Sequence, residues 1–265
     1  MKRFIVLAVL VVLASAPTLA ERAPYRFEFN LGAYVPTMNT QIRIDSPSGQ
    51  AGVEVDFEDN LALENTKVVP LGQADFWISK KHGISFVFFD LSRESSGPST
   101  ITFRWGDTEF PADVPLKVKF DTRVLALTYS YKFFNNERRS FGFNVGFNIN
   151  EIDVGVATLD EQLGREESAQ ATAPLPTIGV NGHVMLGKKW RFYGTLGVFA
   201  LSYDVYDGVL TTISGGFLHQ TFKNVGFGVG YYGFNIGVDS EDEDLLGRVR
   251  YRYNGAVGYL NLRFR

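Results

Sequence analysis

The chain has no cysteine, only three histidines and, beyond its first twenty residues, no apolar run long enough for a membrane-spanning helix. Without cysteine, a disulfide framework, a thiolate metal site and a cysteine nucleophile are excluded. A spanning helix needs about 20 apolar residues, and charged or polar residues interrupt every run here. Glycines 226, 228 and 230 have strand period, so no phosphate-binding glycine loop is present. If the mature chain enters a membrane, it must do so as a closed barrel.

The first twenty residues predict a secretory signal peptide. Lys2 and Arg3 precede a short apolar core, and small residues up to Ala20 suit a cleavage site. We expect cleavage before Glu21, which leaves one domain over residues 21–265. The mature chain then keeps 24 of the 26 basic residues against 29 acidic ones, a net charge of −5. This balance gives no reason to expect a nucleic-acid partner.

Residues 141–149 alternate large apolar side chains with glycine or asparagine, in the order Phe-Gly-Phe-Asn-Val-Gly-Phe-Asn-Ile. Successive side chains of a strand point to opposite faces, so this strand has an apolar face and a small polar face. In a soluble sandwich the polar face would meet water, where charged residues are commoner. Lipid against the apolar face and a crowded barrel interior against the polar face fit better.

Similar stretches recur, and they predict an all-β, closed antiparallel transmembrane β-barrel of about ten strands. Eight or twelve strands are alternatives, because the boundary at 204–208 is weak. We expect a β-bulge near Asn150, where the apolar positions change from odd to even numbers. The ten strands are predicted at 24–35, 68–78, 84–93, 116–132, 141–156, 174–186, 190–203, 209–222, 225–238 and 246–264, with short extensions at 41–44 and 52–57.

The predicted connections form two unlike sets. The short ones are basic, as at Lys80-Lys81 and Lys188-Lys189, and the long ones are mainly acidic. Short periplasmic turns and long outer loops characterise bacterial outer-membrane barrels, and an even strand number returns both termini to the periplasm. The last strand ends in Leu260, Leu262 and Phe264, which resembles the signal read by the barrel-assembly machinery, although Arg265 follows. We therefore expect the outer membrane, with its lipids, its lipopolysaccharide and that machinery as partners.

The mature chain also resembles an uncharacterised family of proteobacterial outer-membrane β-barrel proteins. The resemblance implies the barrel and its location, and it supplies no activity or ligand. It is carried by Asp56-Phe57-Glu58-Asp59-Asn60-Leu61, Phe89-Asp90-Leu91-Ser92-Arg93, Arg104-Trp105-Gly106-Asp107-Thr108, Pro174-Leu175-Pro176-Thr177, Tyr206-Asp207-Gly208 and Tyr251-Arg252-Tyr253-Asn254-Gly255.

The candidate site is a cluster of charges in the lumen. Arg248, Arg250 and Arg252 alternate with apolar or aromatic residues, and they point inward if those residues face lipid. Glu151 and Asp153 are expected on the inward face at the same outer end, where they would compensate the arginines. Nearer the periplasm, a second predicted pair joins the first and last strands. Its members are Glu28 and Arg263.

We interpret these charges as a structural plug, since small barrels are filled by side chains. The alternative is a selective path for a small anion. Of the histidines, His82 has Ser85 nearby and His219 has Thr221, but neither pair has an obvious orienting acid. His183 is interpreted as an interior polar residue.

No metal or cofactor site is predicted. The acidic stretches 239–244 and 56–59 lack the glycine and the ligand spacing of a calcium loop, so we interpret them as solvated. The predicted function is therefore a non-enzymatic integral outer-membrane barrel with a structural or surface-interaction role. The alternatives are a narrow channel for small solutes or anions, an outer-membrane enzyme that hydrolyses lipid A or phospholipid, and a soluble periplasmic barrel with an apolar ligand. Oligomeric state is not predicted.

Overall fold

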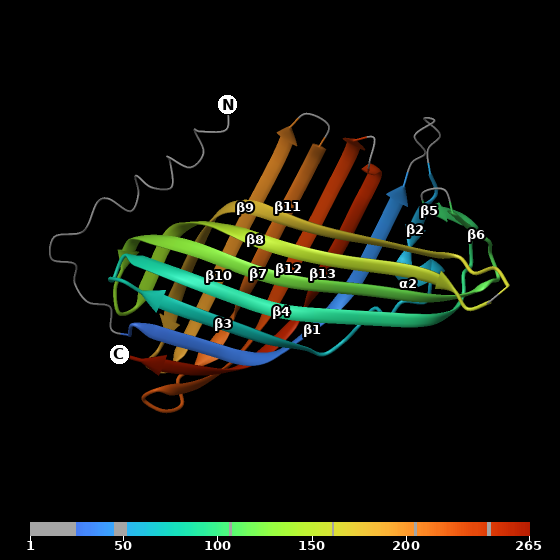
Figure 1. Cartoon of the computed structure of the whole chain (residues 1–265). Coiled ribbons are helices and arrows are strands. Elements are labelled where there is room, and N and C mark those ends of the chain that lie inside the picture. The colour runs from blue at the N-terminus through green and yellow to red at the C-terminus, as the bar shows by residue number, and fades with distance from the viewer. Residues whose placement is uncertain (1–24, 45–51, 106–107, 161, 204–205, 243–244) are drawn as a thin grey trace.

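The computed structural model describes residues 25–44, 52–105, 108–160, 162–203, 206–242 and 245–265. The predicted signal peptide, residues 1–20, lies outside them. Ten long antiparallel strands form one closed barrel (Figure 1). They are β1 (Phe27–Ile44), β3 (Val69–Trp77), β4 (His82–Pro98), β7 (Pro115–Asn135), β8 (Arg139–Thr158), β9 (Glu166–Leu186), β10 (Trp190–Tyr203), β11 (Tyr206–His219), β12 (Val225–Asp242) and β13 (Leu245–Phe264).

Neighbouring strands in the chain are neighbours in the barrel, in the order β1, β3, β4, β7, β8, β9, β10, β11, β12 and β13. The first and last strands close it, with pairs running from Phe27↔Phe264 to Ile44↔Gly247. The predicted fold class and the count of ten are confirmed. No helix among the described residues has the length and apolarity needed to cross a membrane.

An apolar belt covers the outside of the barrel towards the end that carries the short turns. Its large side chains are exposed, and the residues between them face the interior. Exposed phenylalanines in such numbers would be costly in water, whereas hydrocarbon accepts them. The belt includes Phe27, Leu31, Phe76, Phe86, Phe88, Leu127, Phe133, Phe141, Phe143, Val145, Phe147, Ile178, Phe192, Leu196, Val198, Ile213, Phe217, Phe227, Val229 and Phe264.

Above the belt the alternation inverts. On β8, Phe147 faces outward, but Val154 and Val156 are buried inside. The β-bulge predicted near Asn150 is wrong, because the register between β8 and both its neighbours runs through this position without a shift. The pairing of β7 with β8 shifts instead between Lys132 and Phe134. The strands continue without interruption from the membrane into water. Only the face that carries the apolar residues changes, from the outer face in the belt to the inner face above it.

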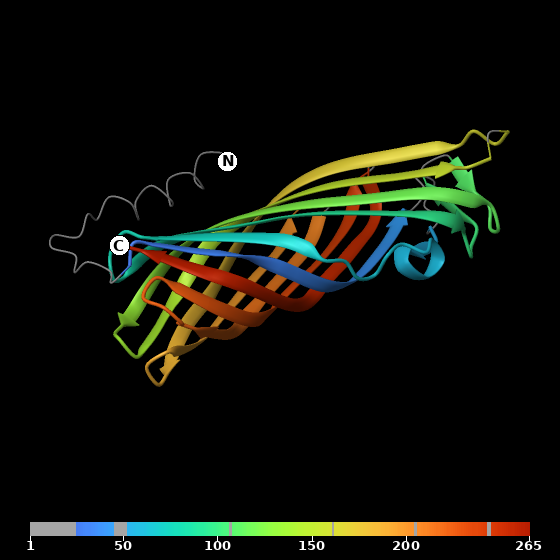
Figure 2. The same ribbon diagram turned by 90° about the horizontal axis from the view of Figure 1, so that it is seen from below.

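The inversion reflects strand length. About 9–11 residues span the hydrocarbon core, whereas β7 and β9 have 21 residues each. Their outer halves, with those of β4 and β8, extend beyond the barrel (Figure 2). Four short elements pack near them: β2 (Glu54–Asp56), α2 (Phe57–Asn60), β5 (Phe103–Trp105) and β6 (Thr108–Phe110). We call these elements, with the outer parts of β7 and β8, the outer ledge.

The outer ledge has a hydrophobic core of its own. Phe57 of α2 packs edge-on against Phe120 of β7, with ring centroids 5.7 Å apart. Phe103 and Phe110 of the β5–β6 hairpin stack at 5.1 Å. This core also contains Ile42, Val55, Leu61, Leu63, Leu116, Val118, Val154 and Val156. The long connections 52–68 and 99–114 are thus folded structure in large part, not solvated loop.

On one side of the barrel, the neighbouring strands β9 and β10 separate towards the outer end. β9 pairs with β10 only as far as Ile178↔Val198, and beyond that β9 has β8 as its partner up to Glu166↔Ala157. Pro174 and Pro176 lie in this stretch, and proline, which has no N–H to donate, is confined to edges of sheets. These two prolines are therefore the signal in the sequence that β9 has a free edge here and separates from β10.

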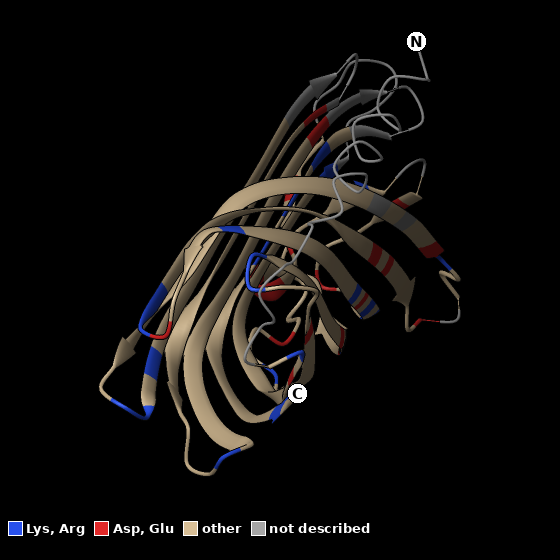
Figure 3. Cartoon of the chain, turned by 90° about the vertical axis from the view of Figure 1, so that its left-hand side faces the viewer, with Lys and Arg blue, Asp and Glu red and all other residues tan. Residues whose placement is uncertain are grey.

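The two ends of the barrel differ in charge. The near end in Figure 3 carries the chain's C-terminus and the short turns, and its turns are mainly basic. Its basic residues include Lys81, Arg138, Lys188 and Lys223. At the other end, the predicted acidic loop 239–244 is mostly strand, since β12 runs to Asp242. The short turns mark the periplasmic side and the outer ledge marks the outer side.

Candidate functional site

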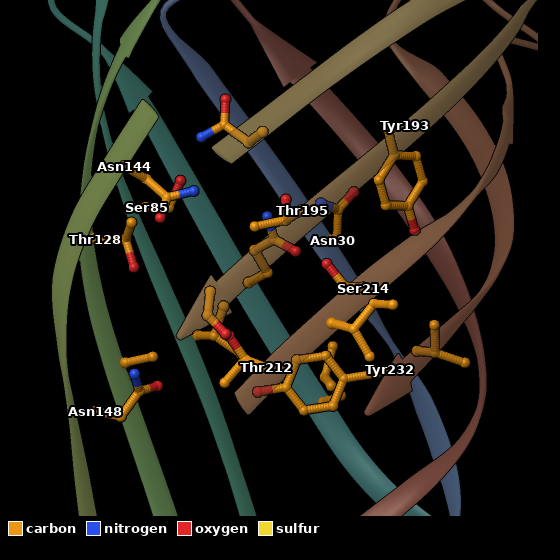
Figure 4. A pocket seen from close by; sticks show the side chains of 18 of the residues that line it. Asn30, Ser85, Thr128, Asn144, Asn148, Tyr193, Thr195, Thr212, Ser214 and Tyr232 are labelled. Carbon is orange, nitrogen blue, oxygen red and sulfur yellow. The ribbon is translucent and has the colours of Figure 1, made fainter. Parts of the chain in front are cut away.

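A cavity of about 150 Å³ lies in the lumen, at the level of the apolar belt (Figure 4). Amides and hydroxyls line it from several strands, among them Asn30, Asn144, Thr195 and Ser214. No charged side chain is among its lining residues in the part of the chain that is described. Since a water molecule occupies about 30 Å³ in the liquid, the cavity has room for about five waters or one small neutral polar molecule.

Below the cavity, a carboxylate crosses the lumen at the periplasmic side. Glu28 of β1 is buried and forms an ion pair with Arg191 of β10, four strands away around the barrel. Arg263 approaches Glu28 Oε1, the oxygen that Arg191 contacts, at 3.5 Å, and the Asn261 amide donates a hydrogen bond to this oxygen at 2.8 Å. The predicted pair of Glu28 with Arg263 is confirmed. Sequence reasoning missed Arg191, because pairing across the lumen leaves no local signal.

Further polar groups continue this layer. Ser85 and Gln73 donate hydrogen bonds to Asp75, the latter at 2.9 Å. Lys132 donates to the Asn181 side chain, and its ammonium lies 5.7 Å from the Trp77 ring centroid. Charges inside the lumen are therefore paired or hydrogen-bonded near the periplasmic mouth, as buried charges must be. They narrow this mouth beneath the neutral cavity.

Above the cavity, aromatic side chains fill the lumen. Rings from β1, β4, β12 and β13 contact one another at centroid distances of 5.2–6.2 Å. The Tyr251 hydroxyl donates to the Asn150 side chain at 3.2 Å, joining β13 to β8, which is five strands away in either direction. We call this group the aromatic plug. It consists of Tyr34, Phe89, Tyr232, Phe234, Tyr251 and Tyr253.

A buried arginine joins the aromatic plug to the outer ledge. Arg93 of β4 is fully buried, and its guanidinium contacts Glu58 of α2 at 2.5 Å and donates to Thr40 at 2.7 Å. The guanidinium carbon also lies 4.9 Å from the Phe120 ring centroid and 5.7 Å from that of Tyr253. Arg93 and Glu58 belong to two of the segments that carry the family resemblance, but their pairing was not predicted.

The helix α2 is capped by an acid whose charge the fold stabilises. Asp56 accepts hydrogen bonds from the backbone N–H groups of Glu58 and Asp59, and from the Asn39 side chain at 2.9 Å. Burial raises the pKa of Asp56, but these bonds and one from Gln41 outweigh it and hold the pKa below its usual value. The acidic stretch 56–59 is therefore a helix N-terminus, not a solvated loop.

The predicted outer cluster in the lumen is wrong. Tyr251 and Tyr253 are buried in the interior, so Arg250 and Arg252 between them face outward and are exposed. Arg248, on the same outward face, is paired with Asp239 of β12. The prediction assumed that aromatics face lipid along the whole strand. That assumption fails here, because this part of β13 lies above the membrane.

The two acids of that predicted cluster are also outside. Glu151 contacts Arg123 at 3.0 Å, and Arg123 contacts Asp90 at 3.2 Å on its other side. Asp153 lies 3.6 Å from Lys119. These residues form ion pairs across the outer surface of β4, β7 and β8 at the upper edge of the apolar belt. Neither acid contacts the arginines of β13, so the outer lumen offers no path built on these charges.

The histidines do not form the predicted pairs in every case. His219 is 3.0 Å from Thr221 as expected, but His82 contacts Tyr129 at 2.6 Å, and Ser85 bonds to Asp75 instead. Sequence reasoning missed a third pair, the Ser140 hydroxyl 2.6 Å from His183 Nδ1 across β8 and β9. No carboxylate is hydrogen-bonded to His183 among the described residues, so this serine–histidine pair lacks the orienting acid of a triad. The described residues contain no cluster of three metal-binding side chains.

No family model matches the chain, and no curated protein matches it in sequence. It is similar in structure to the toluene transporter TodX of P. putida, with 9% identity over 92% of this chain and 91% of that one, and a TM-score of 0.38. The attachment invasion locus protein Ail of Yersinia pestis gives 9% identity, 90% and 99% coverage and a TM-score of 0.36. The transport unit of the Escherichia coli autotransporter AIDA-I gives 9% identity, 98% and 97% coverage and a TM-score of 0.42.

These similarities are too low to assign a family or an activity. The assignment to a membrane rests on the chain's own structure. A closed antiparallel sheet, an apolar outer belt, short basic turns at one end and extended strands at the other are the features of bacterial outer-membrane proteins. The chain is an integral β-barrel of the bacterial outer membrane.

Proposed function

We propose that the protein is a non-enzymatic structural barrel that displays a folded ledge at the cell surface for interaction with other molecules. The observation that carries this proposal is the second hydrophobic core, in which α2 and the β5–β6 hairpin pack with the outer parts of β7 and β8. A channel needs only loops that leave its mouth clear. A compact core above the membrane instead presents a fixed surface, which suits recognition because less ordering entropy is lost on binding.

The filled lumen supports a structural role over a channel. The Tyr251–Asn150 hydrogen bond crosses it above the cavity, and the Glu28–Arg191 ion pair crosses it below. The small-anion path expected from Arg248, Arg250 and Arg252 loses its basis, because all three lie on the outer surface. Within the described part of the chain, the neutral cavity between the two layers is the feature that favours a channel, for a small uncharged solute.

Reconstitution into planar bilayers tests the closed lumen. We expect the purified protein to leave the bilayer silent from −100 to +100 mV. As a positive control, Tyr251→Gly/Tyr253→Gly removes two rings of the aromatic plug and is expected to produce current steps. A steady current from the wild type would contradict the closed lumen and favour the narrow channel.

Surface display can be tested by labelling, because the chain has no cysteine and any introduced one is unique. Lys117 is exposed on the outer ledge and Lys189 is exposed in a short turn. On intact cells, a membrane-impermeant maleimide is expected to label Lys117→Cys and to leave Lys189→Cys unlabelled until the cells are broken. The reverse pattern would contradict the assigned orientation and with it the display of the ledge.

The same proposal includes assembly by the barrel-assembly machinery. The last strand presents Leu260, Leu262 and Phe264 on one outward face, and it pairs with β1 through its final residues. Replacing Phe264 with serine is expected to reduce the amount of folded barrel in cells, measured by heat-modifiable migration in gels, while the purified variant still refolds in detergent. Equal levels of folded variant and wild type in cells would argue against recognition of this residue.

A further inference from the structure

The outward face of β13 changes from apolar to basic at the outer edge of the belt. Leu260 and Leu262 lie on this face near the periplasmic end, and Arg252 and Arg250 lie on it farther out. Both side chains are exposed. Among the described residues, neither guanidinium group has an ion pair or a side-chain hydrogen bond, although the backbone of both residues belongs to the sheet. Two unpaired arginines side by side repel each other, so a stable structure needs an anion or only water around them.

Their height matches the lipid headgroups of the outer leaflet. Phe264, the lowest belt residue of β13, and Arg252 are twelve residues apart on one strand. With a rise of about 3.4 Å per residue and a tilt of about 40°, this separation corresponds to roughly 31 Å along the membrane normal. The apolar band of such barrels is about 25 Å tall. Arg252 therefore lies just above the hydrocarbon, at the height of the lipid headgroups, and Arg250 lies one step farther out.

The surrounding side chains favour an anion at this place. Asn39 is paired in register with Arg252 across the β1–β13 seam and Gln41 with Arg250, so the β1 neighbours of the two arginines carry uncharged amides. The nearby acids have partners: Asp56 accepts from both amides and caps α2, and Asp239 pairs with Arg248. Glu54 is paired in register with Arg43 farther out.

The opposite wall of the barrel makes this corner distinctive. At the same boundary on β4, β7 and β8, the arginine Arg123 lies between two carboxylates, those of Asp90 and Glu151. Its charge is compensated within the protein. Lys67, which precedes β3 near the same level, donates to the Ser92 carbonyl at 2.6 Å. In the described structure the β1–β13 seam differs from both places, because it carries two adjacent arginines without a carboxylate partner.

We propose that Arg250 and Arg252 bind a phosphate of the phosphorylated glycolipid anchor of lipopolysaccharide in the outer leaflet. An arginine offers a planar fork of N–H donors that matches phosphate oxygens, and two forks on one strand face can hold one phosphate from two sides. The acyl chains would then lie on the apolar belt below, along Ala256 and Leu260. The seam that closes the barrel is thereby also a lipid site, which is separate from the surface role of the outer ledge.

The test measures lipid retention by native mass spectrometry of the full-length mature protein in detergent. Three probes are titrated: bisphosphorylated, monophosphorylated and fully dephosphorylated lipid A. The wild type is expected to prefer the bisphosphorylated form. In Arg250→Gln/Arg252→Gln its affinity for that form should fall about 30-fold, since each basic side chain near an anionic surface contributes roughly a factor of five. Affinity for the dephosphorylated form should be unchanged.

The matched control is Arg138→Gln/Arg139→Gln, which removes two exposed arginines at the periplasmic end, Arg138 in the turn and Arg139 at the first position of β8. It is expected to bind all three probes as the wild type does. Arg250→Lys/Arg252→Lys should bind with intermediate affinity, because lysine keeps the charge and loses the fork. Inorganic phosphate added at the lipid concentration should not displace the lipid, which distinguishes a headgroup site from a free-anion site.

Equal wild-type affinity for phosphorylated and dephosphorylated lipid A would overturn the proposal. So would an equal loss of affinity in the control variant, because binding would then follow net charge alone. Heat-modifiable migration of each variant shows that the barrel is folded before titration. None of these outcomes depends on whether the outer ledge is a recognition surface.

Discussion

Arg93 is expected to hold the outer ledge onto the barrel. Its side chain is fully buried and its partner, the Glu58 carboxylate, is 7% exposed. Removing one member of a buried ion pair costs about 3–5 kcal/mol, because the other charge is left without compensation. Arg93→Met keeps much of the side-chain volume and removes the charge. We therefore expect a loss of stability in that range, concentrated in α2, the helix that carries Glu58.

Hydrogen exchange measured by mass spectrometry can locate this loss. Local opening of α2 governs exchange in residues 54–64, and 3–5 kcal/mol corresponds to exchange faster by about two to nearly four orders of magnitude. The membrane parts of β7 and β8 should keep wild-type protection. Unchanged exchange in residues 54–64 of Arg93→Met would refute the role assigned to the buried pair.

Two further variants make the test specific. Arg93→Met/Glu58→Gln removes both charges, so it should recover much of the protection lost in the single variant. The control is Arg104→Met, which breaks the Arg104–Glu109 pair at 3.5 Å, whose side chains are 68% and 50% exposed. An exposed pair contributes at most about 1 kcal/mol, so exchange should change by less than a factor of about five.

Three other predictions concern the pH response, the membrane boundary and the serine–histidine pair. Because the pKa of Asp56 is lowered in the folded protein, its carboxylate stabilises α2 at pH values above the pKa of an unfolded aspartate, about 3.9. This contribution is lost as the pH falls through the lower pKa of the folded state. Hydrogen exchange in residues 54–64 should therefore accelerate at low pH, and Asp56→Asn should remove that dependence. Val145→Arg, in the belt, should cost about 2–4 kcal/mol in unfolding titrations with lipid vesicles, whereas Gly155→Arg, on the same face above the belt, should cost about 0–1 kcal/mol; equal costs would contradict the boundary. Ser140→Ala should leave lipid A and phospholipid composition unchanged in cells, as thin-layer chromatography would show.

The strands were predictable because most of them alternate in polarity and are bounded by turn signals, although the stretch 84–93 is too aromatic for its inward face to be assigned from sequence. Residues 141–149 are the clearest case, since glycine and asparagine on one face fit a crowded interior and phenylalanine on the other fits lipid. The predicted count of about ten strands is confirmed. The outer ends of β4 and β9 were not predicted, because β4 continues to Pro98 and β9 begins at Glu166, past the membrane, where their outward faces become as polar as those of a soluble sheet.

The site was predictable only where register decides it. Glu28 and Arg263 face each other because the first and last strands must close the barrel, and the register of β1 with β13 places them opposite one another. Arg191 and Arg93 could not be found in this way. Each is paired across the lumen or with a connection folded back into it, and such contacts depend on barrel diameter and on loop packing rather than on any local pattern.

One physical reason connects the wrong prediction at Arg250 and Arg252 with the wrong β-bulge near Asn150. A strand keeps its geometry where it leaves the hydrocarbon, but the surrounding medium changes from lipid to water, so the side that prefers apolar residues changes from the outside to the inside. On β8 that change falls between Phe147 and Ile152, and it resembles an inserted residue when only the sequence is read. On β13 it falls between Leu260 and Tyr253. An inversion of alternation without a bulge therefore marks the membrane surface, and a row of outward arginines just beyond it lies where lipid phosphates are.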